Sequence, residues 1–523
     1  MNNLFLGIDV STQGAKAVVL DWSDKSIIYK YKIDYDNDLP QYKTINGVIT
    51  DNKTGSSESD PLMWIDAINL LFANLSSSKE VQINNIKAIS VSGQQHGLVA
   101  LDKYGNLSRS TSKLWNDFST KKECKILTDF IGGKKNMINE IANTQRTGYT
   151  ASKILNMSIN EKNSYDNTKT FLLVHNYINW YLTGGVSCME YGDASGTALW
   201  DPITKTWSNK LINFISEDLK LKLPNVYSPT NAIGLISKEL VAKYNFPNNC
   251  MIDAGSGDNM YGAIGTGNTK EGIVTISLGT SGTAYTFMKE PYIDRDGEIA
   301  CFCDSTGNYL PLVCVSNMAN GYTEFLKSNS ISHSNFEKLI LESPPGNKGN
   351  IIIPWFKGER TPDIPNASAI YFGFTPKELN KKNIARGILE GHINNLHYGF
   401  SKLPVNPKII HLTGGLSNSI SWCQTISDIF DCETIRVDGE GAAIGAAIHS
   451  IWVWLRENKS SIEISEICEP FINYDLSMTC KPRNEFKNVY IKQRRLFKAL
   501  SNRMRNTGKD ENPFEIRGLF LNK

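Results

Sequence analysis

Two segments far apart in the chain share one layout, an apolar strand, a turn of small polar residues and a second apolar strand. The first covers residues 4–22, LFLGIDVSTQGAKAVVLDW, and the second covers residues 272–288, with GTSG at its turn. Each pattern predicts a β-hairpin. Because one hairpin opens each half of the chain, the pattern predicts a duplicated α/β domain rather than a solenoid of short repeats.

Length and composition exclude several broad classes of protein. With 523 residues, 41% of them hydrophobic and 21% charged, the chain is too long for one ordinary core and predicts at least two folded domains. Lys and Arg number 55 against 53 Asp and Glu, so no excess positive charge is available to bind nucleic acid or an anionic membrane. The sequence has no apolar run of membrane-spanning length and no C-x-x-C pair. The apolar residues 4–10 are interrupted by Gly7 and Asp9 and have no basic flank, so we do not expect them to act as a secretory leader. We therefore expect a cytoplasmic protein that binds neither nucleic acid nor membranes.

Two further turns of small residues follow predicted strands. The strand over residues 87–91 leads into SGQQHG, which puts His96 at the carboxyl end of a strand, where open α/β sheets bind ligands. The strand over residues 408–412 leads into TGGLSN and a helix over residues 420–430. Such a strand–glycine–helix unit can receive a nucleotide.

The remaining segments give coarser expectations. Residues 34–61 are rich in Asp, Asn, Gly and Ser and predict a polar loop. Thr375, Pro376 and Glu378 have the pattern of a helix start, so a long amphipathic helix is expected from Thr375 to Phe400.

The hairpin turns are the best candidates for phosphate binding, because the sequence lacks the G-x-x-x-x-G-K-[ST] loop of the large NTPase class. Turns of Gly, Ser and Thr expose backbone N–H groups and hydroxyls that can cradle phosphates. Either turn alone is a weak signal for phosphate binding, because turns of Gly, Ser and Thr are common in β-hairpins of any function. Together with a third glycine turn at Gly414 and Gly415, the pair favours a phosphate site.

Two aspartates are candidates for chemistry. Asp9 ends an apolar strand, where a carboxylate needs a cation such as a phosphate-bound Mg²⁺, or the N–H groups of a turn that it caps. Asp258 is expected in a loop of small residues, DAGSGDN, where it is open enough to reach a substrate hydroxyl as a general base; the alternative is that this loop acid is a cap. An acid with its ordinary pKa near about 4 is sufficient for that role.

Taken together, these motifs resemble the FGGY family of carbohydrate kinases, in the family's order and over nearly the whole chain. Within the family, SGQQHG, QRTG at residues 145–148 and the stretch over residues 302–321 are most similar to the xylulokinases, with a leaning toward their eukaryotic-type branch. The motifs that carry the resemblance are DVSTQGAK (9–16), SGQQHG (92–97), LWND (114–117), GSGDN (255–259), GTSG (279–282), TGGLSN (413–418) and GAAIG (441–445).

The resemblance implies an α/β fold of two actin-like, ribonuclease-H-like domains that flank a catalytic cleft. Residues 1–256 would bind the sugar and carry the first phosphate hairpin, and residues 257–523 would bind ATP and carry the second. The implied activity is ATP- and Mg²⁺-dependent phosphorylation of a ketopentose, foremost D-xylulose to D-xylulose 5-phosphate, by a monomer or homodimer. The alternatives are a kinase for another sugar or polyol, such as L-ribulose, sedoheptulose or glycerol, and an actin-like, nucleotide-gated binding protein.

The resemblance also assigns roles to individual residues. Asp258 matches the general base, and Asp9 matches the acid that holds the Mg²⁺–phosphate complex, with Asp258 as a second candidate metal contact. The sequence departs from the family at two places: Gln95 stands where bacterial members commonly carry Met, and His333 stands where the eukaryotic branch has a tryptophan near the adenine. The implied sugar-binding residues are Gln95, His96, Arg146, Asp258 and Asn259. The implied ATP- and phosphate-binding residues are Ser11, Thr12, Gln13, Lys16, Gly279, Thr280, Ser281, Gly414, Gly415 and Asn418.

Overall fold

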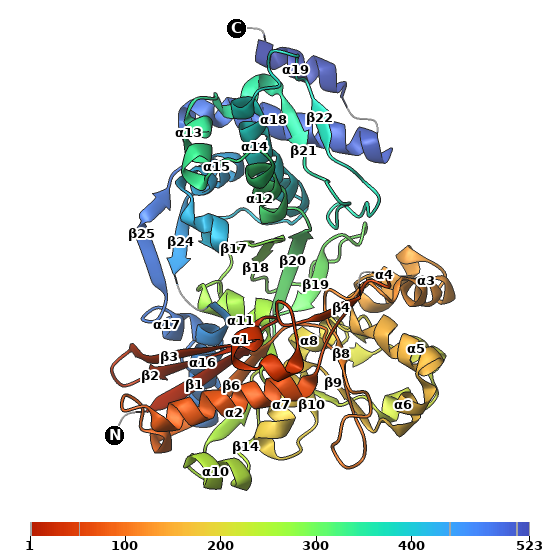
Figure 1. Cartoon of the computed structure of the whole chain (residues 1–523), viewed down its shortest axis with the longest axis vertical. Coiled ribbons are helices and arrows are strands. Elements are labelled where there is room, and N and C mark those ends of the chain that lie inside the picture. The colour runs from red at the N-terminus through yellow and green to blue at the C-terminus, as the bar shows by residue number, and fades with distance from the viewer. Residues whose placement is uncertain (1–2, 52, 439–440, 509–510, 522–523) are drawn as a thin grey trace. The chain divides into compact units, whose positions relative to one another are not determined.

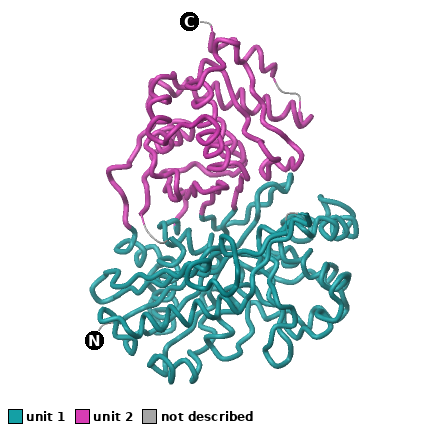
Figure 2. Tube along the Cα trace, viewed as in Figure 1, with its two compact units in different colours: residues 1–269, 287–311, 439–472 teal, residues 270–286, 312–438, 473–523 magenta. Residues whose placement is uncertain are grey.

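The computed structural model describes residues 3–51, 53–438, 441–508 and 511–521 (Figure 1). The chain forms two compact units, each assembled from three stretches of sequence (Figure 2). The first unit comprises residues 1–269, 287–311 and 439–472, and the second comprises residues 270–286, 312–438 and 473–523.

The boundary expected after residue 256 falls inside the first unit. Helix α11 (Asp258–Gly265) packs against helix α16 (Gly441–Glu457), which belongs to the same unit. Glycines allow this close approach, since a Cβ atom on Gly265 would lie 1.7 Å from the Gly441 carbonyl oxygen. The compact units are therefore interleaved along the sequence rather than divided at one point.

A seven-stranded sheet forms the core of the first unit. Strand β1 is buried along its whole length, because its apolar residues face helices on both sides. Its residues Leu6 and Ile8 belong to a hydrophobic cluster with α2 (Pro61–Ser77) and α7 (Val174–Thr183), whereas Gly7 lies against α16. The strands of the main path, in sheet order, are β14 (Ala232–Leu235), β15 (Met251–Asp253), β6 (Ile86–Gly93), β1 (Leu4–Val10), β2 (Gly14–Asp21) and β3 (Ser26–Asp34), and β16 (Ser256–Gly257) pairs with β6.

The sheet of the second unit repeats this topology. In both sheets an antiparallel meander of three strands continues into two parallel strands and ends on an antiparallel edge strand. The seven strands, in sheet order, are β19 (Ala300–Cys303), β20 (Tyr309–Val315), β18 (Gly282–Thr286), β17 (Ile273–Leu278), β23 (Ile409–Thr413), β24 (Thr434–Asp438) and β25 (Asn473–Cys480), so β19 extends the shared pattern by one strand. Strand β17 corresponds to β1 and β18 to β2, so both predicted hairpins and the predicted duplication are confirmed.

Three local expectations differ from the structure. Residues 34–61 are not a plain loop: they contain α1 (Tyr35–Asp38) and strands β4 (Ile49–Asp51) and β5 (Ser56–Ser59), and β5 pairs with β8 (Ser112–Lys113). Polar side chains bond across this last pair, since the Lys113 amine of β8 donates to the Glu58 carboxylate of β5 at 3.1 Å.

The other two differences concern helix starts. The Glu378 carboxylate accepts from the Thr375 N–H at 3.0 Å, as in a helix cap, but the extended backbone of Asn380 interrupts the turn. Helix α14 therefore begins at Lys381, where Asn380 caps it by accepting from the Asn383 N–H. Asp258, expected in a loop, is the first residue of α11.

The remaining elements cover the sheets or form small ribbons. In the first unit the other helices are α3 (Lys121–Phe130), α4 (Lys134–Ile141), α5 (Thr150–Asn160), α6 (Lys162–Asn167), α8 (Tyr191–Ser195), α9 (Asn209–Ile215), α10 (Lys238–Tyr244) and α17 (Ile464–Cys468). Its other strands are β7 (Val99–Leu101), β9 (Thr170–Leu172), β10 (Cys188–Glu190), β11 (Trp200–Asp201), β12 (Thr206–Trp207) and β13 (Asn225–Tyr227). In the second unit they are α12 (Ala319–Ser328), α13 (His333–Leu341), α14 (Lys381–Phe400), α15 (Ile420–Phe430), α18 (Lys487–Arg505), α19 (Pro513–Leu521), β21 (Ile351–Ile353) and β22 (Ile370–Phe372).

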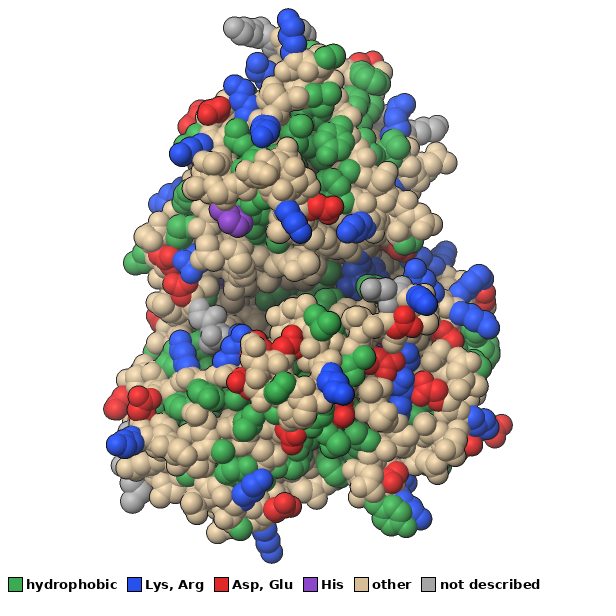
Figure 3. All heavy atoms as spheres, viewed as in Figure 1, with side chains coloured by type: hydrophobic (Ala, Val, Ile, Leu, Met, Phe, Trp, Pro, Cys, Tyr) green, Lys and Arg blue, Asp and Glu red, His purple; other side chains and the backbone are tan. Residues whose placement is uncertain are grey.

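The surface charges agree with the near-neutral composition. On the face drawn in Figure 3, acidic and basic side chains are interspersed rather than gathered into a patch of one sign. Among the helices of the described residues, none combines the length and the apolar composition needed to cross a bilayer.

Candidate active site

Asp9 lies near the carboxyl end of the central strand β1, with strand neighbours on both sides. In the sheet it pairs with Ser92 of β6 and with Lys16 of β2, and the Ser92 hydroxyl donates to Asp9 Oδ1 at 2.7 Å. The Asp9 side chain is buried, with 7% of its surface exposed. A buried carboxylate fixed in this way is a preorganised negative group at the end of the sheet.

The tip of the first hairpin is tied to two neighbouring segments. The Trp115 indole N–H donates to Thr12 Oγ1 at 3.0 Å, and the Thr12 hydroxyl donates to Gln94 Oε1 at 3.1 Å. The Ser11 N–H and hydroxyl both bond to the Gly14 carbonyl oxygen, which closes the turn, while Gln13 is exposed. The structure thus joins the DVSTQGAK, SGQQHG and LWND segments through side chains of their turns.

Asp258 and Asn259 form a hydrogen-bonded group with Gln95 at the start of α11. The Asn259 backbone N–H and side-chain amide donate to Asp258 Oδ1 at 2.9 and 3.1 Å. The same Asn259 amide donates to Gln95 Oε1 at 3.0 Å. Three of the five residues predicted for the sugar therefore lie together, and the N-terminus of the helix favours the negative charge of Asp258.

The electrostatics of Asp258 differ from the expectation of an ordinary acid. Burial, together with the negative charges of Asp9 and Asp193, raises the pKa of Asp258 to about 7, although the hydrogen bonds from Asn259 act in the opposite direction. The carboxylates of Asp9 and Asp258 are thus close enough to repel each other. Within the described residues, no group of three or more His, Cys, Asp and Glu side chains is placed to hold a metal ion.

His96 has a left-handed backbone and a closely packed ring. Its φ angle is 68°, and its imidazole centroid lies 4.6 Å from the Tyr149 ring and 6.0 Å from the Phe302 ring. A Cβ atom on Gly196 would lie 2.6 Å from His96 Cε1, so only glycine fits beside the ring. These contacts give the imidazole one defined orientation.

Arg146, the fifth residue predicted for the sugar, makes its hydrogen bonds elsewhere. Its guanidinium donates to Thr144 Oγ1 and to the Gly297 carbonyl oxygen. A link to the other predicted residues runs through Tyr149, whose backbone N–H donates to the Arg146 carbonyl oxygen and whose ring packs against His96.

The second unit brings its own glycine turns together. Gly414 has a φ angle of 87° and lies directly against Leu278, where an added Cβ would be 2.8 Å from backbone atoms of Leu278. The GTSG turn, which begins at Gly279, follows Leu278 immediately, and Thr280 at its tip is exposed. Of the further residues predicted for ATP, Gly415 is open and Asn418 is exposed. His333 is exposed too, and its ring bonds to the Tyr322 hydroxyl at 2.7 Å.

Several residues around this group were not predicted from the sequence. Ser92, Gln94, Tyr149 and Phe302 contact predicted residues through the tertiary fold, and the charge of Asp193 acts on Asp258. Of these residues, Ser92, Gln94 and Phe302 lie in motifs that were singled out. One signal was available for a further residue, Lys153, a lysine among the apolar positions of helix α5. Such a lysine is unusual enough on a buried helix face to mark a site.

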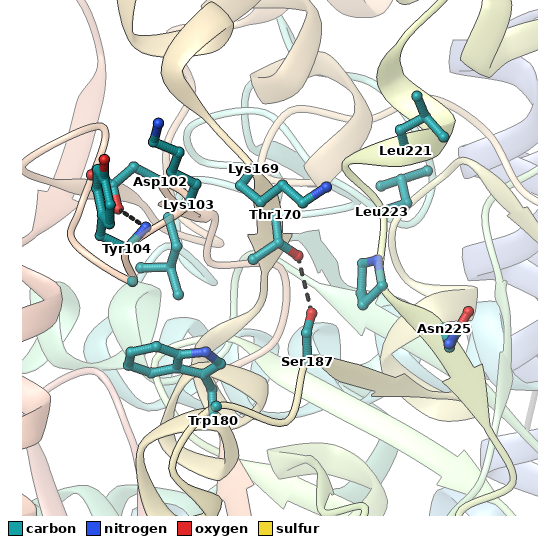
Figure 4. A pocket seen from close by; sticks show the side chains of 14 residues that line it. Asp102, Lys103, Tyr104, Lys169, Thr170, Trp180, Ser187, Leu221, Leu223 and Asn225 are labelled. Carbon is teal, nitrogen blue, oxygen red and sulfur yellow. Dashed lines mark hydrogen bonds between the residues drawn. The ribbon is translucent and has the colours of Figure 1, made fainter.

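A cavity of about 440 Å³ lies in another part of the first unit (Figure 4). Trp180 lies along one wall, and Thr170 Oγ1 and Ser187 Oγ are 3.0 Å apart on another. None of the sequence-predicted site residues lines this cavity, so we do not include it in the candidate active site.

Two family models match the chain in tandem. The N-terminal domain model of the FGGY family of carbohydrate kinases matches residues 4–265, and the C-terminal domain model matches residues 274–454. The chain is similar to xylulose kinase of Haemophilus influenzae, with 34% identity over 501 residues that cover 93% of this chain and 98% of that protein. It is 28% identical to xylulose kinase 2 of Arabidopsis thaliana, with 92% of each chain covered.

Solved structures share the fold. The crystal structure of a xyloylose kinase from Brucella ovis gives a TM-score of 0.86 at 22% identity and covers 97% of this chain and 100% of that chain. That of gluconate kinase from Lactobacillus acidophilus gives 0.85 at 22% identity, with 96% and 98% covered. At these identities the structures bear on the fold alone, and they confirm the predicted two-domain fold class. With both family models matched and a relative aligned over nearly its whole length, the chain belongs to the FGGY family of carbohydrate kinases.

Proposed function

We propose that this carbohydrate kinase transfers the γ-phosphoryl group of ATP to D-xylulose, giving D-xylulose 5-phosphate and ADP. The observation that carries the proposal is the match to a xylulose kinase at 34% identity over 93% of this chain. The hydrogen-bonded group of Gln95, Asp258 and Asn259 supports it, because it offers a base beside polar groups that suit a polyhydroxylated substrate. The ten free thiols of the chain support the expected cytoplasmic setting, in which we propose a monomer or homodimer.

In the proposed mechanism Asp258 is the general base. Its carboxylate accepts the proton of the attacking sugar hydroxyl as the new P–O bond forms and the bond to ADP breaks. Asn259 holds Oδ1 of Asp258 through two hydrogen bonds, which orients the other oxygen for the proton transfer. Phosphoryl transfer depends mainly on in-line placement of the reacting groups, so His96, Arg146 and Gln95 would contribute by holding the ketose.

The phosphates of ATP would lie against the glycine and hydroxyl turns. In the first unit these are the tip at Ser11, Thr12 and Gln13, with Lys16 beyond it; in the second they are the turn at Gly279, Thr280 and Ser281 and the glycine turn with Gly414, Gly415 and Asn418. Asp9 and Asp258 fit a Mg²⁺–phosphate complex, because their two carboxylates repel each other and are hard oxygen ligands. Bound there, Mg²⁺ would neutralise phosphate charge.

A raised pKa for the base predicts a marked pH dependence. If Asp258 must be ionised, kcat/KM for the ketose at low Mg–ATP should fall about tenfold per pH unit below about pH 7 and level off above it, since its pKa is about 7. Initial rates between pH 5.5 and 9 measure this. A profile that stays flat down to pH 5.5 would contradict the role of Asp258 as a base with this pKa.

The substrate is tested directly by ADP release from Mg–ATP with a panel of acceptors. The panel holds D-xylulose, D-ribulose, L-ribulose, sedoheptulose, D-fructose, gluconate, glycerol and a control without acceptor. We expect D-xylulose to raise the rate far above the control and above every other acceptor. A higher kcat/KM with another acceptor would reassign the substrate, and a rate that no acceptor changes would favour the nucleotide-gated binding protein.

A further inference from the structure

Lys153 is a lysine in the interior of the first unit. It lies in the first turn of α5, and its side chain has no exposed surface. Burial lowers the pKa of Lys153 to about 7, although the charge of Asp117 favours the protonated form. A buried amine is costly for a folded protein, so its presence calls for an explanation in its contacts.

In the described part of the chain, the Lys153 amine makes one hydrogen bond, to the backbone carbonyl oxygen of His96 at 2.7 Å. The Thr150 hydroxyl approaches the same oxygen at 3.4 Å. His96 is the residue whose φ angle is 68°, a conformation that a residue with a side chain adopts only at a cost. The hydrogen bond from Lys153 therefore acts where the backbone needs support.

The same stretch of chain also packs against the His96 ring. Tyr149 directly precedes α5 and lies four residues before Lys153, and its ring centroid is 4.6 Å from that of His96. Lys153 thus holds the backbone of His96 while Tyr149 contacts its imidazole. Both contacts depend on the first turn of one helix, so they act on His96 as one rigid support.

We propose that Lys153 is a positioning residue, which fixes His96 in the left-handed conformation that presents its imidazole to the ketose. This inference rests on the proposed function, in which His96 binds the sugar. It assigns Lys153 no contact with substrate or with the reacting atoms. Its effect should therefore appear in sugar binding rather than in the phosphoryl-transfer step.

The chain offers a matched control in a second buried lysine. Lys222 donates to the carbonyl oxygens of Tyr165 and Thr168 at 3.2 and 2.7 Å, as Lys153 donates to that of His96. It belongs to no part of the proposed site. Lys222→Met therefore removes a comparable amine without changing the support of His96.

The experiment compares Lys153→Met, Lys222→Met, His96→Ala and the double variant Lys153→Met/His96→Ala. We expect Lys153→Met to raise KM for D-xylulose about tenfold, with kcat and KM for ATP changed less than about twofold, and Lys222→Met to leave all three near wild type. If Lys153 acts through His96, the double variant should have the same KM as His96→Ala alone. Lys153→Arg should restore part of the loss.

Two results would overturn the inference while the wild type still uses D-xylulose. One is an unchanged KM in Lys153→Met; the other is a double variant whose losses multiply, as for independent residues. Should the wild type show no sugar-dependent ATP use, the proposed function fails, and NMR of the seven histidines decides the inference separately. Lys153→Met should then shift the imidazole signal of His96 and Lys222→Met should not; an unmoved His96 signal in Lys153→Met would refute the support.

Discussion

Asp258→Asn is expected to lower D-xylulose-dependent turnover by at least about 100-fold, the usual scale for a general base, and to leave ATP affinity near wild type. The same substitution should stabilise the protein at neutral pH. Asp258 has a pKa of about 7 in the folded protein, and an unfolded aspartate has one near about 3.9. Between these values the folded state binds more protons, so its stability falls as the pH rises through that window. Asparagine removes this cost.

Steady-state kinetics and thermal unfolding of the ligand-free protein measure the two effects. The Tm of Asp258→Asn should exceed that of the wild type by a few degrees at pH 8. The difference should shrink toward pH 4, where the wild-type carboxyl is protonated in the folded state and about half protonated in the unfolded state. Asp304→Asn is a suitable control for the loss of turnover. It alters another buried carboxyl of the first unit whose pKa is raised, but this carboxyl lies outside the proposed site. Near-normal turnover in Asp258→Asn would remove Asp258 from the mechanism.

Gly445→Ala is expected to be among the most destabilising single substitutions in the chain. A Cβ atom on Gly445 would lie 1.9 Å from the Tyr261 carbonyl oxygen and 2.9 Å from the Gly265 backbone nitrogen. Helices α16 and α11 would have to move apart, which should lower the free energy of unfolding by about 3 kcal/mol or more. Because α11 begins with Asp258, the remaining folded protein should also lose turnover.

Gly441→Ala provides the matched control for this prediction. It adds the same methyl group at the start of the same helix, at a position where a Cβ atom would have none of the described residues beyond its own turn within 4 Å. Alanine favours the helix over glycine, so its Tm should equal or exceed that of the wild type. Thermal unfolding of the two variants decides the matter, and a Gly445→Ala protein as stable as Gly441→Ala would show that the helices adjust at little cost.

The sequence predicted those parts of the fold that depend on local patterns. The two hairpins and the strand–glycine–helix unit were found because alternation, apolar runs and glycine turns are properties of neighbouring residues. The sequence placed the start of α14 at Thr375 because Thr375 and Glu378 do form the hydrogen bond of a helix cap. That bond closes a single turn, and the helix itself begins at Lys381. The interleaving of the two units was missed, since nothing local shows that Gly265 and Gly445 face each other across two helices.

In the candidate site, too, the sequence predicted the features that depend on local motifs and not those that depend on the tertiary structure. The motifs pointed to Gln95, Asp258 and Asn259, and the hydrogen bonds of Asn259 join all three. The raised pKa of Asp258 depends on burial and on the charges of Asp9 and Asp193, which only the tertiary structure brings close. Sequence reasoning therefore found the candidate groups and missed the electrostatics that set their protonation.

The packing of α16 against strand β1 has a consequence for biosynthesis. Strand β1 leaves the ribosome long before α16, because α16 lies at residues 441–457. Until α16 is made, the face of β1 that carries Gly7 has no covering helix, and its apolar strand resembles the exposed segments that bind chaperones or aggregate. Nascent chains that stall before residue 441 should accordingly be prone to aggregation and rapidly degraded. An isolated fragment of residues 1–256 should need a separately supplied α16 peptide to stay in solution.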